Sequence, residues 1–222
     1  MSAIDCMVIV AHMDDESLSC GGLISRHLRA GHTVAVITVF DRKYNYGEGP
    51  QHLTEQMDAF EKAMTCLDSN PAVSRMDWRH LLFAEGEPGQ QSYYQVLKYL
   101  ESELDRLRPR QVVIHDDQDR NQDHLWLTTV CKIALRPFGN DFVDQILMCQ
   151  SPDGLPKKTN YYVRMTKEVV DRKQDAVNCY AREARVSPHP RSPEMLKAWH
   201  QMHGSYCGAE FAEPYRLYYQ RE

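Results

Sequence analysis

The sequence predicts an α/β protein with a Rossmann-like open sheet, mostly parallel, that carries helices on both faces. Short apolar runs rich in β-branched residues alternate with longer segments whose apolar residues recur at helical spacing. The first run, residues 7–11, is apolar at every position, as expected of a strand buried on both faces. Polar clusters follow two of the predicted strands, which is where ligands bind in such sheets.

Six segments have the composition of strands. The second of them, TVAVITVF, follows Gly31, a residue suited to ending the helix before it. It completes a strand-helix-strand unit with the first strand. The predicted strands are residues 7–11, 33–40, 81–84, 111–114, 145–149 and 161–165.

The predicted helices follow these strands, and each has one apolar face. In the first helix, Leu23, Ile24 and Leu28 recur at helical spacing after the pair Gly21-Gly22. Pro109 ends a later helix, because proline cannot continue one. The later helices are predicted at residues 53–67, 94–107, 125–135 and 167–185.

We expect a single domain over residues 1–222, since this is an ordinary length for an α/β fold. Three prolines between residues 187 and 193 indicate a hinge-like connection. The chain beyond it is rich in aromatic residues and contains Gly204 and Gly208. Residues 186–222 are therefore expected to form a C-terminal extension packed on the domain.

Charge and composition exclude several classes of partner. A net charge of −5 and a pI of about 6.1 favour neither nucleic acid nor an anionic membrane surface as the main partner. No apolar run is long enough to span a membrane, and the N-terminal run is too short for a signal peptide. Seven cysteines, an odd number without any C-x-x-C pair, indicate free thiols and a cytoplasmic protein.

The first polar cluster, His12-Met13-Asp14-Asp15-Glu16, follows the first strand and opens the first helix. His12 and Asp15 are three residues apart across this turn, close enough to bind one metal ion. That leaves Asp14 and Glu16 as candidates for a general base beside a metal-bound water. The alternative is helix capping, because acidic residues are favoured at the start of any helix. Capping explains one or two of these acids, but not three directly after a histidine.

A second polar cluster, residues 115–124, lies between a later strand and helix. Both clusters stand at the same edge of a parallel sheet, so they can meet although about a hundred residues separate them. His124 can supply a third metal ligand and leave one position open for water. His115 is the rival ligand, or a hydrogen-bonded residue of the pocket. His200 and His203 also have helical spacing, but packing or solvation explains them better, since no acid accompanies them.

The polar segment 41–51 follows the second strand and contains two glycines, a proline and two tyrosines. Because it leaves the carboxyl end of a strand, it should lie over the same edge as His12. Arg42 or Lys43 could then meet an anionic or polar substrate, and the segment could close over it. The alternative is an ordinary surface loop.

These motifs resemble those of the LmbE-like or PIG-L family of zinc-dependent deacetylases. Residues 12–16, with Gly21-Gly22 after them, resemble the family's A-H-P-D-D-E motif. Residues 119–124 resemble its second motif, D-x-[HN]-x-D-H, and residues 204–213 resemble its closing G-x-x-x-G…A-E-x-F region. The resemblance extends over almost the whole chain.

The resemblance implies that His12, Asp15 and His124 are zinc ligands and that Asp14 is the base that activates the zinc-bound water. It also implies that Asp123 lies behind the ligands and supports them. The implied reaction removes the acetyl group from a substrate that contains N-acetylglucosamine or a related N-acetyl amino sugar. Zn²⁺ is the implied cofactor, and another divalent ion such as Fe²⁺ is the alternative.

The chain departs from the family pattern at two positions. Met13 replaces the usual proline, which loosens the turn but touches no ligand. Asn121 stands where many members have a histidine thought to polarise the carbonyl or protonate the leaving amine. Asparagine can donate a hydrogen bond but cannot deliver a proton at neutral pH. We therefore expect Asn121, together with Arg42, to bind substrate, and Asp14 to act as base and then as acid unless His115 helps.

Three other functions are compatible with these residues. An amidase on the same fold would remove a larger acyl group. An iron enzyme with two histidines and one carboxylate has the same ligand set, although such proteins usually have a β-jelly roll and no use for Asp14. A sugar-binding or scaffold protein would keep the fold without catalysis. For the deacetylase we expect a small N-acetylated sugar or sugar conjugate as partner, and assembly into oligomers is compatible with the sequence.

Overall fold

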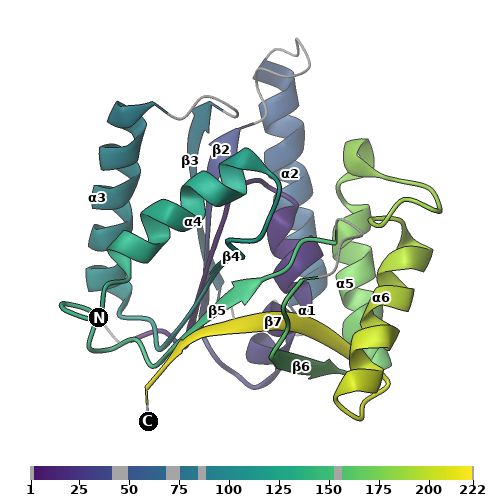
Figure 1. Ribbon diagram of the computed structural model, residues 1–222. Helices are drawn as coiled ribbons and strands as arrows, with labels where there is room; N and C mark the ends of the chain where they lie inside the picture. The colour runs from purple at the N-terminus through teal and green to yellow at the C-terminus, as the bar shows by residue number, and fades with distance from the viewer. Residues whose placement is uncertain (1–2, 42–49, 69–75, 85–88, 153–156, 222) are drawn as a thin grey trace.

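A computed structural model describes residues 3–41, 50–68, 76–84, 89–152 and 157–221 of the chain. The strands within these ranges are β1 (Cys6–Val10), β2 (Val34–Asp41), β3 (Met76–Ala84), β4 (Gln111–His115), β5 (Gln145–Cys149), β6 (Tyr161–Met165) and β7 (Phe211–Gln220). They form one sheet in the order β3-β2-β1-β4-β5-β7-β6 (Figure 1). Strands β1 to β5 pair in parallel, and β7 is antiparallel to both of its neighbours. The predicted mostly parallel α/β sheet is confirmed.

The strand order reverses direction at β1. The chain passes from β1 to β2 and β3 on one side, and then returns to place β4 on the other side of β1. In open α/β sheets, ligands bind outside the carboxyl ends of the strands at such a switch point. The two polar clusters predicted from the sequence follow β1 and β4, the two strands that meet there.

Helices cover both faces of the sheet, as predicted (Figure 1). They are α1 (Asp15–Arg29), α2 (Pro50–Leu67), α3 (Gln90–Leu107), α4 (Gln122–Ala134), α5 (Lys167–Asn178) and α6 (Pro193–Tyr206). Helices α1, α2 and α5 contact one another, and α3 contacts α4. Alternate residues of β1 enter two cores: Cys6, Val8 and Val10 pack with the first group, and Met7 and Ile9 with the second. Because β1 is buried on both faces, its end is a rigid support for the residues that follow.

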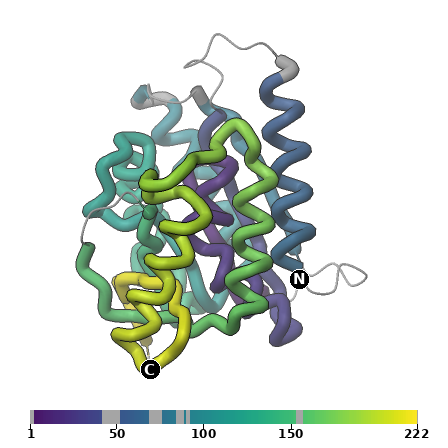
Figure 2. Tube along the Cα trace, turned by 90° about the vertical axis from the view of Figure 1, so that its right-hand side faces the viewer, coloured from purple at the N-terminus to yellow at the C-terminus, as the bar shows by residue number. Residues whose placement is uncertain are grey.

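The C-terminal elements belong to the same sheet and its covering layer. Helix α6 packs on β7 and lies beside α5 (Figure 2). Strand β7 lies between β5 and β6, so residues 211–220 form an internal strand. Sequence reasoning missed this strand because a glutamate and a proline, Glu213 and Pro214, interrupt its apolar pattern.

Glu213 is tolerated inside the sheet because its carboxylate ties β7 to α1. The side chain is fully buried, and it accepts the backbone N–H groups of Gly22 and Leu23 at 2.9 Å each. Lys173 from α5 pairs with the same carboxylate at 2.5 Å, and the Tyr215 hydroxyl donates to it at 2.5 Å. These contacts give the closing A-E motif a structural role, which is to hold α1 against the sheet.

The predicted and observed bounds differ most for two elements. The helix expected at 167–185 ends at Asn178, because Tyr180 leaves helical geometry (φ −86°, ψ 65°) and turns its side chain toward Glu16 on α1. The helical spacing extended through Tyr180 because this residue is buried, although it is not in the helix. The strand expected at 81–84 begins earlier, at Met76.

The remaining sequence predictions concern the segment after β2, membrane spans and cysteines. Most of segment 41–51, including Arg42 and Lys43, lies outside the described residues. In the part of the chain that the structure describes, no helix combines the length and the apolar character needed to cross a membrane. All seven cysteines fall within the described ranges and are free thiols.

Candidate metal centre and active site

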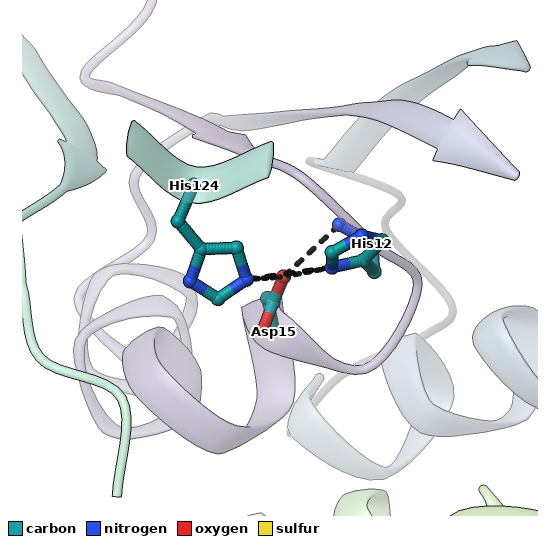
Figure 3. A group of neighbouring side chains, drawn as sticks. All are labelled: His12, Asp15 and His124. Carbon is teal, nitrogen blue, oxygen red and sulfur yellow. Dashed lines mark hydrogen bonds and ion pairs between the residues drawn. The ribbon is translucent and has the colours of Figure 1, made fainter. Parts of the chain in front are cut away.

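The candidate site lies where β1 and β4 end side by side. His12 lies in the turn between β1 and α1, Asp15 is the first residue of α1, and His124 lies in the first turn of α4, the helix that follows β4 (Figure 3). Each of the three side chains is about 1% exposed. Because β1 and β4 are paired in parallel, residues more than a hundred positions apart reach the same point.

One atom from each of these three residues faces the other two. Asp15 Oδ2 lies 3.2 Å from His12 Nδ1 and 3.1 Å from His124 Nε2, and the two nitrogens are 3.4 Å apart (Figure 3). The group can therefore hold one metal ion. Two imidazole nitrogens and a carboxylate oxygen are a donor set that zinc accepts while keeping a position for water.

The opposite nitrogen of each imidazole contacts a second carboxylate. His12 Nε2 lies 3.1 Å from Asp123 Oδ2, and His124 Nδ1 lies 3.1 Å from Asp119 Oδ2. An ionised carboxylate only accepts, so these outer nitrogens carry the hydrogens and donate. The inner nitrogens lie toward Asp15 Oδ2, so in the neutral imidazoles their lone pairs are available to a cation held between the three atoms. The arrangement fits a metal ion, and Asp119 is a supporting residue to which sequence reasoning gave no role.

The pKa values of these three side chains also favour a cation between them. Burial opposes a charge on His124, but the carboxylates of Asp15 and Asp119 outweigh it and raise the pKa of His124 to about 10. Burial also opposes a charge on His12, yet Asp123 and Asp15 raise its pKa. Burial favours the neutral form of Asp15, but the two histidines hold its pKa well below the ordinary value. Without a bound metal, these shifts favour protonated imidazoles beside an ionised Asp15.

His115, the rival ligand, is buried and already takes part in a hydrogen bond. Its Nε2 accepts the backbone N–H of Ala11 at 2.9 Å, which leaves the hydrogen on Nδ1, facing Cys149 Sγ at 3.9 Å. The ring stacks on His124 with centroids 3.8 Å apart. His115, Asp119 and His124 also satisfy the distances of a metal group. His115 Nε2 already accepts from Ala11, and Asp119 already contacts His124 Nδ1. We therefore favour the group of His12, Asp15 and His124 as the metal site.

Asp14 stands at the N-cap position of α1 but does not cap the helix with its side chain. Its backbone carbonyl accepts the N–H groups of Ser17 and Leu18, while its side chain makes no capping hydrogen bond. The backbone has φ 149° and ψ −28°, an uncommon conformation for a residue other than glycine. The carboxylate is about 1% exposed, and Arg191 Nη1 lies 3.5 Å from Oδ2. The capping alternative therefore does not describe Asp14.

Both carboxylate oxygens of Glu16, the other candidate base, accept hydrogen bonds from neighbouring groups. It accepts the backbone N–H of Asp14 at 3.0 Å and the hydroxyls of Ser17 and Tyr180 at 2.7 Å each. Burial raises the pKa of Glu16 to about 7, while the two hydroxyl donors oppose the shift. Tyr180 was not singled out from the sequence, because only the fold brings it 164 positions back to the first cluster.

The other predicted site residues have different surroundings. Asn121 is the N-cap of α4, where its Oδ1 accepts the N–H groups of Asp123 at 2.8 Å and His124 at 3.4 Å. It thereby orients the turn that carries His124, a role the sequence did not indicate. His200 and His203 are packed, each with Nδ1 against a backbone carbonyl oxygen.

Comparison with known proteins decides the family. The model of the PIG-L family, described as GlcNAc-PI de-N-acetylase, matches residues 7–135, which include both polar clusters. The chain belongs to the PIG-L family. The resemblance stated from the motifs is confirmed, and this PIG-L chain carries the matched segment as β1 to α4. No curated protein matches it in sequence.

Solved structures with the same fold have different activities. The conserved protein TT1542 from Thermus thermophilus is 22% identical, with a TM-score of 0.74, and covers 99% of this chain and 96% of its own. The N,N'-diacetylchitobiose deacetylase from Pyrococcus horikoshii is 17% identical, with a TM-score of 0.73, covering 97% and 84%. GalB, a 4-carboxy-2-hydroxymuconate hydratase from Pseudomonas putida KT2440, is 15% identical, with a TM-score of 0.76, covering 99% and 98%. These likenesses establish the fold, and the reaction must be inferred from the site.

Proposed function

We propose that this PIG-L chain is a zinc-dependent N-deacetylase that removes the acetyl group from a substrate containing N-acetylglucosamine or a related N-acetyl amino sugar. Membership of a de-N-acetylase family supports the reaction class. The observation that carries the proposal is the convergence of His12 Nδ1, Asp15 Oδ2 and His124 Nε2, and the buried Asp14 directly precedes Asp15 in the chain. The free thiols support a reducing compartment, for which we propose the cytoplasm.

In this proposal His12, Asp15 and His124 hold the metal, and the outer carboxylates of Asp123 and Asp119 fix the orientation of the two imidazoles. Bound zinc would polarise the acetyl carbonyl and lower the pKa of its water. The short histidine–carboxylate contacts support these assignments, since such contacts keep the ligand nitrogens free of hydrogen and correctly aimed.

Asp14 takes a proton from the attacking water as the bond to the acetyl carbon forms. When the carbon–nitrogen bond breaks, the leaving amine needs a proton. Asn121 cannot supply it, and His115 is fully buried with Nε2 accepting from Ala11. Asp14 is therefore assigned to return the proton it took, so that one carboxylate acts as base and then as acid. Arg42 and Asn121 are assigned to substrate binding.

The test measures the carboxylic acid and the free amine that a zinc-loaded preparation releases from a panel of N-acetylated sugars, their conjugates and analogues with longer acyl chains. We expect acetate from at least one N-acetyl compound, and a loss of kcat of about 10²-fold or more in Asp14→Ala. Asp117→Ala is the matched control, because this acid is exposed and pairs with Lys132 and Arg216. Release that survives Asp14→Ala would overturn the mechanism, and faster release of longer acyl groups would establish an amidase instead.

A further inference from the structure

We propose that Glu16 and Tyr180 form a positioning pair that holds the backbone of Asp14 in the conformation its catalytic carboxylate needs. The inference rests on the proposed function, because it explains how the chain places the base of that reaction. It adds a residue from beyond the family-matched segment, since Tyr180 lies between α5 and α6 whereas the match ends at residue 135.

The first step is the conformation of Asp14. A positive φ in a residue other than glycine persists only where its surroundings enforce it, and such residues gather at active sites. With an ordinary extended backbone, an aspartate at the N-cap bonds to the N–H groups of its own helix. At φ 149° the Asp14 side chain makes no such bond, and its Oδ2 instead lies 3.5 Å from Arg191 Nη1.

The second step is what enforces this conformation. Glu16 Oε2 accepts the Asp14 backbone N–H at 3.0 Å, which fixes the peptide group just before the strained residue. Glu16 Oε1 is held in turn by the hydroxyl of Tyr180 at 2.7 Å. Glu16 is fully buried and Tyr180 is 3% exposed, so water does not replace either contact. A hydrogen-bonded chain thus runs from the end of α5 to the base.

The third step is why this tyrosine leaves its helix. Helix α5 ends at Asn178, and Tyr180 adopts a non-helical conformation that turns its ring into the core beside α1 and α2. A buried tyrosine needs a partner for its hydroxyl, and the partner here is Glu16 rather than a backbone carbonyl. The contact couples the α5 side of the molecule to the candidate active site.

Tyr180→Phe tests the pair with little change in packing. We expect it to lower kcat about tenfold, and Glu16→Ala about 100-fold, with KM and the metal content nearly unchanged, because a small misplacement of a base mainly slows chemistry. Glu16→Gln should recover most of the loss, since its amide oxygen can still accept the Asp14 N–H. The double variant Tyr180→Phe/Glu16→Ala should be no slower than Glu16→Ala, because the two residues act in series.

Tyr215→Phe is the matched control. It removes a hydroxyl that donates to another buried glutamate, Glu213, whose carboxylate accepts the backbone N–H groups of Gly22 and Leu23. We expect kcat within twofold of the parent, whatever the loss of stability. An active parent with unchanged kcat in Tyr180→Phe, or additive effects in the double variant, would overturn the inference alone. A parent without deacetylase activity would overturn the proposed function, and the pair is then tested by a crystal structure of Glu16→Ala, where retention of φ near 149° at Asp14 would overturn it.

Discussion

At the scale of single residues, the site is defined by which nitrogen of each histidine carries a hydrogen. Asp123 and Asp119 accept from the outer nitrogens of His12 and His124, so the inner nitrogens, which lie toward Asp15, are the ones that can bind a metal. The family resemblance implied a supporting role for Asp123, but neither it nor the sequence pattern gave a role to Asp119. The role of Asp119 depends on the orientation of the His124 imidazole, which contacts it from five positions along the chain. No periodicity in the sequence indicates that contact.

Zinc binding is predicted to release protons. The pKa of His124 is raised to about 10 in the metal-free protein, so at about pH 8 this imidazole is protonated, whereas a ligand nitrogen must be neutral. Calorimetry in buffers of different ionisation enthalpy should show release of at least one proton per zinc.

The raised pKa of His124 also contributes to the free energy of unfolding of the protein without zinc. This contribution is fully present below about pH 6.5 and is lost as the pH rises toward 10. Zinc binding without proton release would contradict the raised pKa.

Asp119→Asn is predicted to weaken zinc binding about 10- to 100-fold, because the His124 ring loses the carboxylate that fixes its tautomer. Competition with a chelator measures this affinity. The control is Asp117→Asn, which changes an acid paired with Lys132 rather than with an imidazole. Equal affinities for both variants would show that Asp119 does not support the ligand.

At the scale of elements, the sequence predicted β1 and β4, the strands that carry the site, to within one residue, and β5 and β6 at their observed bounds, but it missed β7. The apolar runs at β1 and β4 are buried on both faces, and such runs are recognisable without their neighbours. Strand β7 was missed because Glu213 is acceptable in a buried strand only once Lys173 and two N–H groups of α1 surround it. Those partners are long-range, so the local pattern predicted no strand.

Gly22→Ala is predicted to destabilise the fold by about 1–3 kcal/mol, because the added methyl group overpacks the contact between α1 and β6. Its Cβ would lie 2.3 Å from Met165 Sδ and 3.1 Å from the Glu213 carboxylate. Gly89→Ala is the control, since a Cβ there meets no atom within 4 Å. Thermal or denaturant unfolding measures both. Equal stability of the two variants would mean that the fold does not depend on the close contact of Gly22 on α1 with Met165 and Glu213.

At the scale of the whole molecule, the topology does most to create the site. The chain crosses to β2 and β3 before β4 returns to the other side of β1, so the two polar clusters end at one switch point. This convergence was predictable, because parallel strands share one edge for their carboxyl ends. The support behind Asp14 was not predictable, because it depends on where α5 ends and on which way Tyr180 turns.

The central claim is that segments following β1 and β4 bind one divalent cation together. Anomalous diffraction at the zinc edge, from a crystal grown with zinc, tests it most directly. We predict one peak within about 2.0–2.2 Å of His12 Nδ1, Asp15 Oδ2 and His124 Nε2. A zinc-loaded crystal with no peak between these atoms, or with the two imidazoles turned apart, would contradict it.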